Sequence, residues 1–491
     1  MYFSDGNANN LNISVGRAVL APPSGQSVLP ARFSDSAIRA RYDSALTTPE
    51  NARHWRSADP LSADAAMNFQ VRKTIRERAR YEIANNTYAK GLVLTFASDI
   101  IGTGPRIQLR SPLNSKLSPK WETRIETAFA EWAEETCLAE KLTTLAQAKT
   151  GDGEAFGLMV YNPALESPVK FELVPIECDR ITASFEMNSR PNCIDGVIID
   201  NIGNPVAYEY MEEHPGDTSS TKASLAQWRR VDARWVVHWF RKDRPEQHRG
   251  ISEIAPALPL FAQLRRYTLA TIAAAETAAD YAAILYTDNP ATQTAVKAVP
   301  FDMVEIAKRT MTVLPDGWKM GQFNPEQPVT TYAEFKREVL GEIARCLQVP
   351  VNVISGDSSH HNYASGRLDH QTYHRAIRVN QHQCARVVLN KLFREWIKEY
   401  SLSLGQSDRK FDSLKAEWFF DGFEHVDPKK EADAQAVRLA SLTTGLAREY
   451  AKQGLDWEVE LEQIARERAK MKELGIAMEE AVPNVQEKED E

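Results

Sequence analysis

The sequence predicts an α+β protein, in which helical segments lie on either side of a central β-rich part. Three observations lead to this prediction. Apolar residues recur at helical spacing in the first 150 residues and again beyond residue 250, short β-prone runs lie between residues 155 and 240, and turn residues separate those runs. The order of helices, strands and helices is typical of an α+β chain and not of a doubly wound sheet.

Length and composition indicate an ordinary globular chain. Its 491 residues suffice for two to four domain-sized units. The net charge of -8 argues against a protein that coats DNA through bulk positive charge. Five scattered cysteines without a CxxC motif fit free thiols in a reducing compartment. Since no apolar stretch approaches the roughly 20 residues that a membrane span needs, we expect a soluble intracellular protein with no membrane partner.

The N-terminal part is predicted to hold an arm and two long helices. Residues 1–35 are rich in Asn, Ser, Gly and Pro, which predicts a flexible arm. Helical spacing covers 67–99 and Gly102 stops it. Ser and Pro at the start of 118–151 fit the N-cap and the first position of a second helix.

Five cations between Arg72 and Arg80 lie in the first of these helices. They could form a nucleic-acid patch. Because a helical period spreads them over much of the circumference, the sequence favours solvated surface residues or ion pairs between subunits.

Short β-prone runs follow between 155 and 240. They are Phe156–Tyr161, Val169–Val174, Gly196–Asp200, Val206–Tyr210 and Trp235–Phe240. The glycine-rich stretch 151–157 superficially resembles a dinucleotide-binding loop, but a helix precedes it and a strand follows it. That order is the reverse of what phosphate binding requires.

Residues 251–286 are predicted to form one long helix, with eight alanines in 270–283. Such small side chains suit either a crowded ring of parallel helices or a tightly packed internal helix. Residues 287–328 form a small unit in which 311–314 and 318–323 flank a Pro-Asp-Gly turn, as in a hairpin.

The following segments are predicted to form a helix, a loop and a second helix. Thr331 and Glu334 make a capping box that opens the first helix, and Pro350 ends it. A polar loop covers 354–363, before a helix over 364–400. That helix is polar in its first half and amphipathic in its second, so we expect it to be anchored at its C-terminal end. An acidic helical tail begins at 428.

Enzyme motifs are missing from the sequence. It contains no Gly-Lys dipeptide, and therefore no Walker A loop, and no G-x-S-x-G elbow. The strongest enzymatic candidate is a cluster of five histidines within 23 residues: His360, His361, His370, His374 and His382. The cluster lacks the H-E-x-x-H pattern. We expect solvent- or partner-facing imidazoles, no metal and no cofactor, while a metal-dependent hydrolase or nuclease remains the alternative.

Motifs in a fixed order over about 40–425 give the chain a family resemblance. They are Arg39-Ala-Arg-Tyr-Asp43 with His54-Trp55, Arg78-Ala-Arg80 with Asn85-Asn86, Ile101-Gly-Thr-Gly104, Gly153-Glu-Ala-Phe156, Glu172-Leu-Val-Pro-Ile176, His238-Trp-Phe240, Gln247-His-Arg-Gly-Ile-Ser252, Leu314-Pro-Asp-Gly317 and Ser355-Gly-Asp-Ser-Ser359 with Asn362-Tyr-Ala-Ser-Gly-Arg367. In these the chain resembles the lambda-type portal proteins of tailed bacteriophages. His361 and Ala364 depart from the pattern in the last motif.

The resemblance implies an α+β protein with the phage portal fold, which assembles into a dodecameric ring and is not an enzyme. Each region then receives a place in that plan. The expected regions are 1–35 arm, 36–250 wing, 251–286 stem helix, 287–328 clip, 329–349 second stem helix, 350–364 tunnel loop, 365–425 channel helix and wing return, 426–480 crown, and 481–491 disordered tail.

The same resemblance implies partners and places. Double-stranded DNA passes the channel, the large terminase docks at the clip, head-completion or connector proteins follow, and the major capsid or scaffold protein surrounds the wing. The expected locations are the virion vertex and, during assembly, the host cytoplasm. A shorter head–tail adaptor ring is a further alternative.

Three groups of residues are predicted to form the site. The tunnel-loop residues expected near DNA are Asp357, Ser358, Ser359, His360, His361, Asn362 and Tyr363. The expected phosphate contacts are Arg367, Arg375 or Arg378, and the expected ring-packing residues of the stem are Ala274 and Ala278.

Overall fold

The computed structural model divides the chain into two units, Met1–Pro60 and Leu61–Glu491. In the first unit only 48–60 are described, a run of turns in which the Thr48 and Asn51 side chains bond each other's backbone N–H. The arm predicted at 1–35 lies outside the described residues. The structure describes residues 48–110, 119–184, 187, 190–217, 227–280, 284–287, 318–321, 332–360, 362–406, 411, 414–423, 428–455 and 457–475.

The second unit begins with α1 (Ala63–Ala66), α2 (Phe69–Asn85) and α3 (Thr87–Ile101). The prediction of one helix over 67–99 is therefore wrong. The chain breaks at Asn86, whose backbone is extended and whose side chain accepts hydrogen bonds from the N–H groups of Tyr88 and Ala89. An Asn side chain that caps the next helix stabilises this break.

The second predicted helix is also two helices, α4 (Pro119–Glu135) and α5 (Leu138–Asp152). Cys137 lies between them in the left-handed region, with φ 50°, and so interrupts the helical hydrogen bonds. The proposed cap, Ser118, lies outside the described residues.

Two antiparallel sheets follow, and the five predicted β-prone runs supply five of their seven strands, while β4 and β7 were not predicted. The first has the order β3-β2-β8 and the second β4-β5-β6-β7. The strands are β2 (Glu154–Tyr161), β3 (Phe171–Ile176), β4 (Cys193–Ile194), β5 (Val197–Ile199), β6 (Pro205–Met211), β7 (Trp228–Asp232) and β8 (Val236–Phe240). Apolar side chains between the sheets, among them Phe156, Val197 and Tyr208, form a small core of their own.

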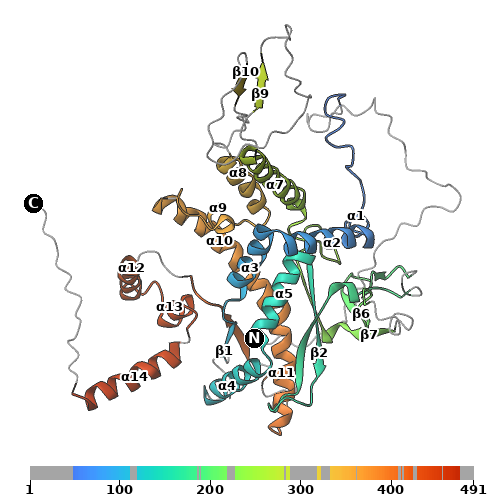
Figure 1. The fold of residues 1–491 in the computed structure, drawn as a ribbon. Helices are drawn as coiled ribbons and strands as arrows, with labels where there is room; N and C mark the ends of the chain where they lie inside the picture. Colours follow the sequence, from blue (N-terminus) through green and yellow to red (C-terminus); the bar gives the residue numbers. More distant parts are fainter. Residues whose placement is uncertain are drawn as a thin grey trace, which may run out of the picture. The chain divides into compact units, whose positions relative to one another are not determined.

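A further strand pair joins segments from distant parts of the chain. β1 (Arg106–Arg110) pairs antiparallel with β11 (Lys415–Phe419), and Figure 1 shows them side by side. Beside them lies the main core, where Trp132 of α4 and Trp396 of α11 (Asn390–Ser403) are fully buried and their ring centroids are 6.5 Å apart. The main core therefore fastens the returning chain to the N-terminal helices.

The predicted long helix over 251–286 is shorter in the structure. After a 3-10 turn (Ala255–Ala257), α7 spans Leu258–Asp280. The residues predicted as its end form β9 (Ile284–Thr287), which pairs with β10 (Trp318–Gly321). The hairpin partner predicted for β10, 311–314, lies outside the described residues, as does most of the predicted clip.

After the predicted clip, the position of Pro350 differs from the prediction that it ends a helix. The helix α8 (Tyr332–Arg345) ends before that residue, and Pro350 instead precedes α9 (Val351–Ser355) as its N-cap. The predicted capping residue Thr331 lies outside the described residues. Proline has no backbone N–H and tolerates a helix start better than a helix interior.

The helix predicted at 364–400 is confirmed as a continuous run. It consists of α10 (Tyr363–Cys384), a π-helical turn (Ala385–Leu389) and α11. The helical tail is also confirmed, with α12 (Pro428–Ala440), α13 (Leu446–Lys452) and α14 (Trp457–Glu473). Among the described residues, we find no helix with the length and apolar character needed to cross a bilayer.

Candidate functional site

An exposed loop joins α9 to α10. Gly356 starts it with a positive φ of 67° and leaves the α9 helix. The Asp357 carboxylate accepts a hydrogen bond from the Ser359 N–H at 2.9 Å, and all described residues from 356 to 362 are exposed. The predicted tunnel loop 350–364 is therefore too long, because 351–355 are helical. His361 lies outside the described residues.

The loop ends at a helix cap. The Asn362 carboxamide oxygen accepts from the Ser365 N–H at 2.8 Å, and the Ser365 hydroxyl accepts from the Asn362 N–H at 3.2 Å. This capping box fixes where α10 begins, with Tyr363 as its first residue. Both ends of the short loop are thus held by local structure.

Helix α10 has one buried and one exposed face. Tyr373, Ile377 and Cys384 are buried, and the Tyr373 hydroxyl donates to Asp99 of α3 at 2.5 Å. On the other face the predicted phosphate-binding residues Arg367, Arg375 and Arg378 are all exposed. The expected anchoring is confirmed, because burial increases toward the π-helical turn, where Val388 and Leu389 are inaccessible.

The histidines do not converge on one point. The His370 ring bonds the Asn352 side chain at 3.0 Å, and the His374 ring stacks on Phe423 with centroids 3.6 Å apart. Burial, together with repulsion from His370 and Arg378, lowers the pKa of His374 to about 4. His360 and His382 are exposed as expected, whereas His370 and His374 are half-buried with partners in the same chain.

Metal-ligand geometry occurs elsewhere. Within the described residues, the group whose ligand atoms lie close enough together is Glu177, Asp179 and His214, where the His214 Nε2 is 2.7 Å from Glu177. Arg80 lies 2.8 Å from the Asp179 carboxylate and already neutralises it. The metal-dependent alternative built on residues 360–382 therefore gains no support from the described histidines.

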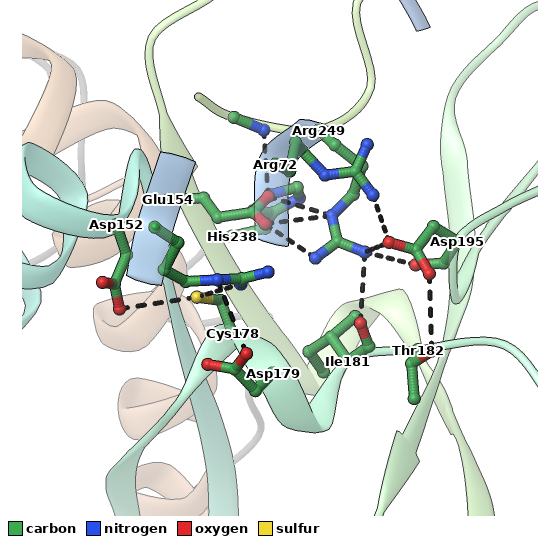
Figure 2. A network of polar contacts seen from close by, with 12 residues as sticks. Arg72, Asp152, Glu154, Cys178, Asp179, Ile181, Thr182, Asp195, His238 and Arg249 are labelled. Atoms are coloured by element: carbon green, nitrogen blue, oxygen red, sulfur yellow. Dashed lines mark hydrogen bonds and ion pairs between the residues drawn. The ribbon is translucent and has the colours of Figure 1, made fainter. Parts of the chain in front are cut away.

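In the basic stretch of α2, Arg72 and Arg76 are buried and Arg80 is half-buried, whereas Lys73 and Arg78 are exposed, as predicted for solvated residues. Arg72 pairs with Asp195, Arg76 lies 3.5 Å from Asp179, and Arg80 lies 2.7 Å from Asp152. Figure 2 shows Arg72 and Arg249 directed toward Asp195. The prediction of solvated residues or subunit ion pairs is wrong for these three arginines. The partners are more than 70 residues away, so local spacing could not identify them.

Arg249 and Glu154 form the centre of this network. Each is about 1% exposed, and the Arg249 guanidinium donates to Glu154 at 2.6 and 2.9 Å. Burial alone would raise the pKa of Glu154, but the Arg249 charge and the hydrogen bonds from His238 and Arg249 hold it well below its usual value. Burial lowers the pKa of His238 to about 4, despite its contact with Glu154 (Figure 2).

The same region fixes the chain where it leaves the sheets for α7. The backbones at Gly153 and Gly250 pass so close that a side chain on Gly250 would meet the Gly153 oxygen at 2.2 Å. The buried Lys149 ammonium lies 2.7 Å from Glu253 and 3.0 Å from the Asn380 oxygen of α10. One lysine thus connects α5, the approach to α7 and the candidate channel helix.

The two alanines predicted to pack the ring are only partly described. Ala274 is half-buried, and Ala278 lies in α7 although its side chain lies outside the described part. α7 contacts α8 through Tyr332, whose hydroxyl donates to Thr268 at 3.1 Å. At about 100° per residue, Ala274 lies on the same side as Thr271 and Tyr267, whereas the exposed Leu269 and Ile272 lie on the other side.

Comparison with known proteins identifies the family. The family described as phage portal protein, lambda family, matches residues 48–381. The chain belongs to this family. The portal family is structural and is not known for an enzymatic activity.

The sequence identity to individual portal and neck proteins is low. A probable portal protein of Halomonas phage phiHAP-1 is 24% identical over 441 residues, which cover 83% of this chain and 82% of the relative. A solved chain from the neck of a native GTA particle is 14% identical, covers 79% of this chain and 94% of its own, and has a TM-score of 0.44. An HK97 family phage portal protein from Corynebacterium diphtheriae is 13% identical, with 70% and 95% coverage and a TM-score of 0.29.

Proposed function

We propose that this portal protein is one subunit of a homododecameric ring at the head vertex of a phage. The ring forms the channel through which double-stranded DNA enters during packaging and leaves during ejection. One observation carries the proposal: α10 is anchored by one face and presents three exposed arginines on the other, directly behind a short exposed loop.

The loop composition suits a conduit. A channel must pass DNA without holding it, and many Lys or Arg contacts would bind the duplex through counterion release. From Gly356 to Asn362 the loop has no Lys or Arg, and the whole chain carries a net charge of -8. The loop residues 357–363 then lie near the duplex, and Arg367, Arg375 or Arg378 makes occasional phosphate contacts.

The ring is built head to tail. In a closed ring of twelve identical subunits, each copy uses two different faces to contact its two neighbours. We assign the two-sheet part to the wing, α7 and α8 to the stem, residues 287–328 to the clip, and α12 to α14 to the crown. Ala274 and Ala278 give α7 the small side chains that close helix packing needs.

The partners and the location follow from this role. We propose the large terminase at the clip, head-completion or connector proteins after packaging, and the major capsid or scaffold protein around the wing. The ring resides in the virion after assembly in the host cytoplasm. It has no catalytic activity of its own in this proposal.

Deletion of residues 358–362 tests the channel assignment. The deletion removes the Asn362 cap, but the buried face of α10 with Tyr373 and Ile377 remains, so rings should stay intact in electron micrographs. Packaged or retained DNA should fall severalfold in particles assembled with the deleted chain. The matched control replaces the same five residues with a Gly/Ser linker, which should restore passage in part. Normal packaging and normal retention in the deletion would contradict the assignment.

A further inference from the structure

Two exposed stripes at heptad spacing lie on neighbouring segments of the chain. On α8 the members are Phe335, Glu338, Glu342 and Arg345, which we call the α8 stripe. On α10 they are Leu368, Thr372, Arg375, Val379 and His382, which we call the α10 stripe. Steps of three and four residues place each set along one side of its helix, as in helices that pack against a partner helix.

Both stripes carry apolar side chains that the chain leaves uncovered. Leu368 and Val379 are each 65% exposed, and Phe335 is 50% exposed although its ring touches Tyr267. Single exposed apolar residues are ordinary on a protein surface. On the α10 stripe, however, Leu368 and Val379 lie seven and four residues from Arg375, and together these side chains form a mixed apolar and cationic face.

The central charges of the two stripes are opposite, and Arg345 is a cation at the end of the α8 stripe. Glu338 and Glu342 lie in the middle of the α8 stripe, and Arg375 lies in the middle of the α10 stripe. Within the described residues, none of these three side chains takes part in an ion pair. At about 1.5 Å per residue the stripes are roughly 15 and 21 Å long, so one can cover most of the other.

From this complementarity we infer that the α8 stripe of one copy packs on the α10 stripe of the next copy. The inference rests on the proposed ring. DNA is the weaker occupant for the α10 stripe, because phosphates gain nothing from Leu368 and Val379. The contact is head to tail, so each copy keeps one stripe available for the next until the ring closes. Arg367 and Arg378 lie outside the α10 stripe and remain available for phosphate.

Charge reversal in the full-length chain tests the contact. Arg375→Glu places like charges against the α8 stripe, and Glu338→Arg with Glu342→Arg does the same from the other side. Each set should lower ring yield about tenfold, measured by mass photometry and negative-stain images, since like charges across an interface oppose association. Combining all three substitutions should return ring yield to within about twofold of the unmodified chain.

Arg378→Glu is the matched control, because it reverses an exposed arginine on the same helix but outside the α10 stripe. It should leave ring yield unchanged. Circular dichroism of each variant monitors folding, which these exposed positions should not alter.

Two results would overturn the contact. Normal ring yield in Arg375→Glu, with DNA retention reduced as in Arg378→Glu, would show that the α10 stripe faces DNA while the channel proposal stands. Ring loss that the triple substitution does not rescue would rule out the pairing of these two stripes. Absence of rings in the unmodified chain would instead refute the proposed function, and this contact with it.

Discussion

Among single residues, the buried charges have the largest consequences. Lys149, Glu154, Arg249 and Glu253 are nearly inaccessible to water, and each has an opposite charge within hydrogen-bond distance. Removing one member of such a pair leaves the other charge buried alone, which is strongly destabilising. These pairs fix the approach to α7 to α5 and β2, and Lys149 also donates to Asn380 of α10, so they position the candidate channel helix.

The neutral state of His238 makes stability depend on pH. Its folded pKa of about 4 lies below the ordinary value of 6.5, so between these values the unfolded chain binds a proton that the folded chain does not. Stability must therefore fall as the pH decreases through this window. Glu154 acts in the same direction only below its ordinary value of 4.5, because its folded pKa is lowered.

Replacing His238 with Gln should remove that dependence. The unmodified chain should lose about 2 kcal/mol more than His238→Gln between pH 7 and pH 5, measured by urea unfolding of the unassembled protein. His382→Gln, at an exposed position on α10, should keep the slope of the unmodified chain. Equal slopes for all three proteins would show that His238 is protonated in the folded state.

The sequence predicts the exposure and the partner of a side chain only where nearby residues determine them. The exposed arginines of α10 followed from a polar half-helix, and the structure confirms their exposure. Arg72, Arg76 and Arg80 were not predictable, because their carboxylate partners lie 72 to 123 residues away and meet them only in the folded chain. Helix spacing locates a side chain on its helix but does not say what packs against it.

Elements show the same division between local and distant causes. The strands near 155–240 and the α10–α11 helix were predicted because turn residues and apolar period mark them locally. The β1–β11 pair was missed because its strands are about 300 residues apart in sequence, as the pairing of Arg106 with Phe419 shows. The breaks at Asn86 and Cys137 were missed because apolar spacing continues across them.

The break between α2 and α3 can be tested at its cap. Asn86→Ala removes the oxygen that accepts from the Tyr88 and Ala89 N–H groups, and should cost about 1 to 2 kcal/mol of unfolding free energy. The neighbouring Asn85→Ala is the control, because Asn85 only donates to the Tyr81 carbonyl within α2, and it should cost about 0.5 kcal/mol or less. Equal losses in urea unfolding would mean that the Asn86 cap does not stabilise the break.

At the scale of the whole molecule, α7 has two packing partners: α8 of the same chain and, in the proposed ring, a neighbouring copy. Its half-buried side, which includes Ala274, faces the same direction as Tyr267, whose ring stacks on Tyr332 of α8. Leu269 and Ile272 lie on the other side, 60% and 49% exposed. If neighbouring copies cover these two, each should contribute about 1.5 to 3 kcal/mol to association.

The two sides of α7 therefore predict different defects. Leu269→Ser with Ile272→Ser should lower ring yield about a hundredfold at fixed concentration, while the melting temperature of the unassembled chain stays the same. Ala274→Leu with Ala278→Leu should also lower ring yield by crowding, but it should change the melting temperature as well, because Ala274 is already partly covered within one copy. Mass photometry and thermal unfolding of the same samples separate these cases. Full ring yield in the serine pair would mean that the subunits of this portal do not associate through the side of α7 that carries Leu269 and Ile272.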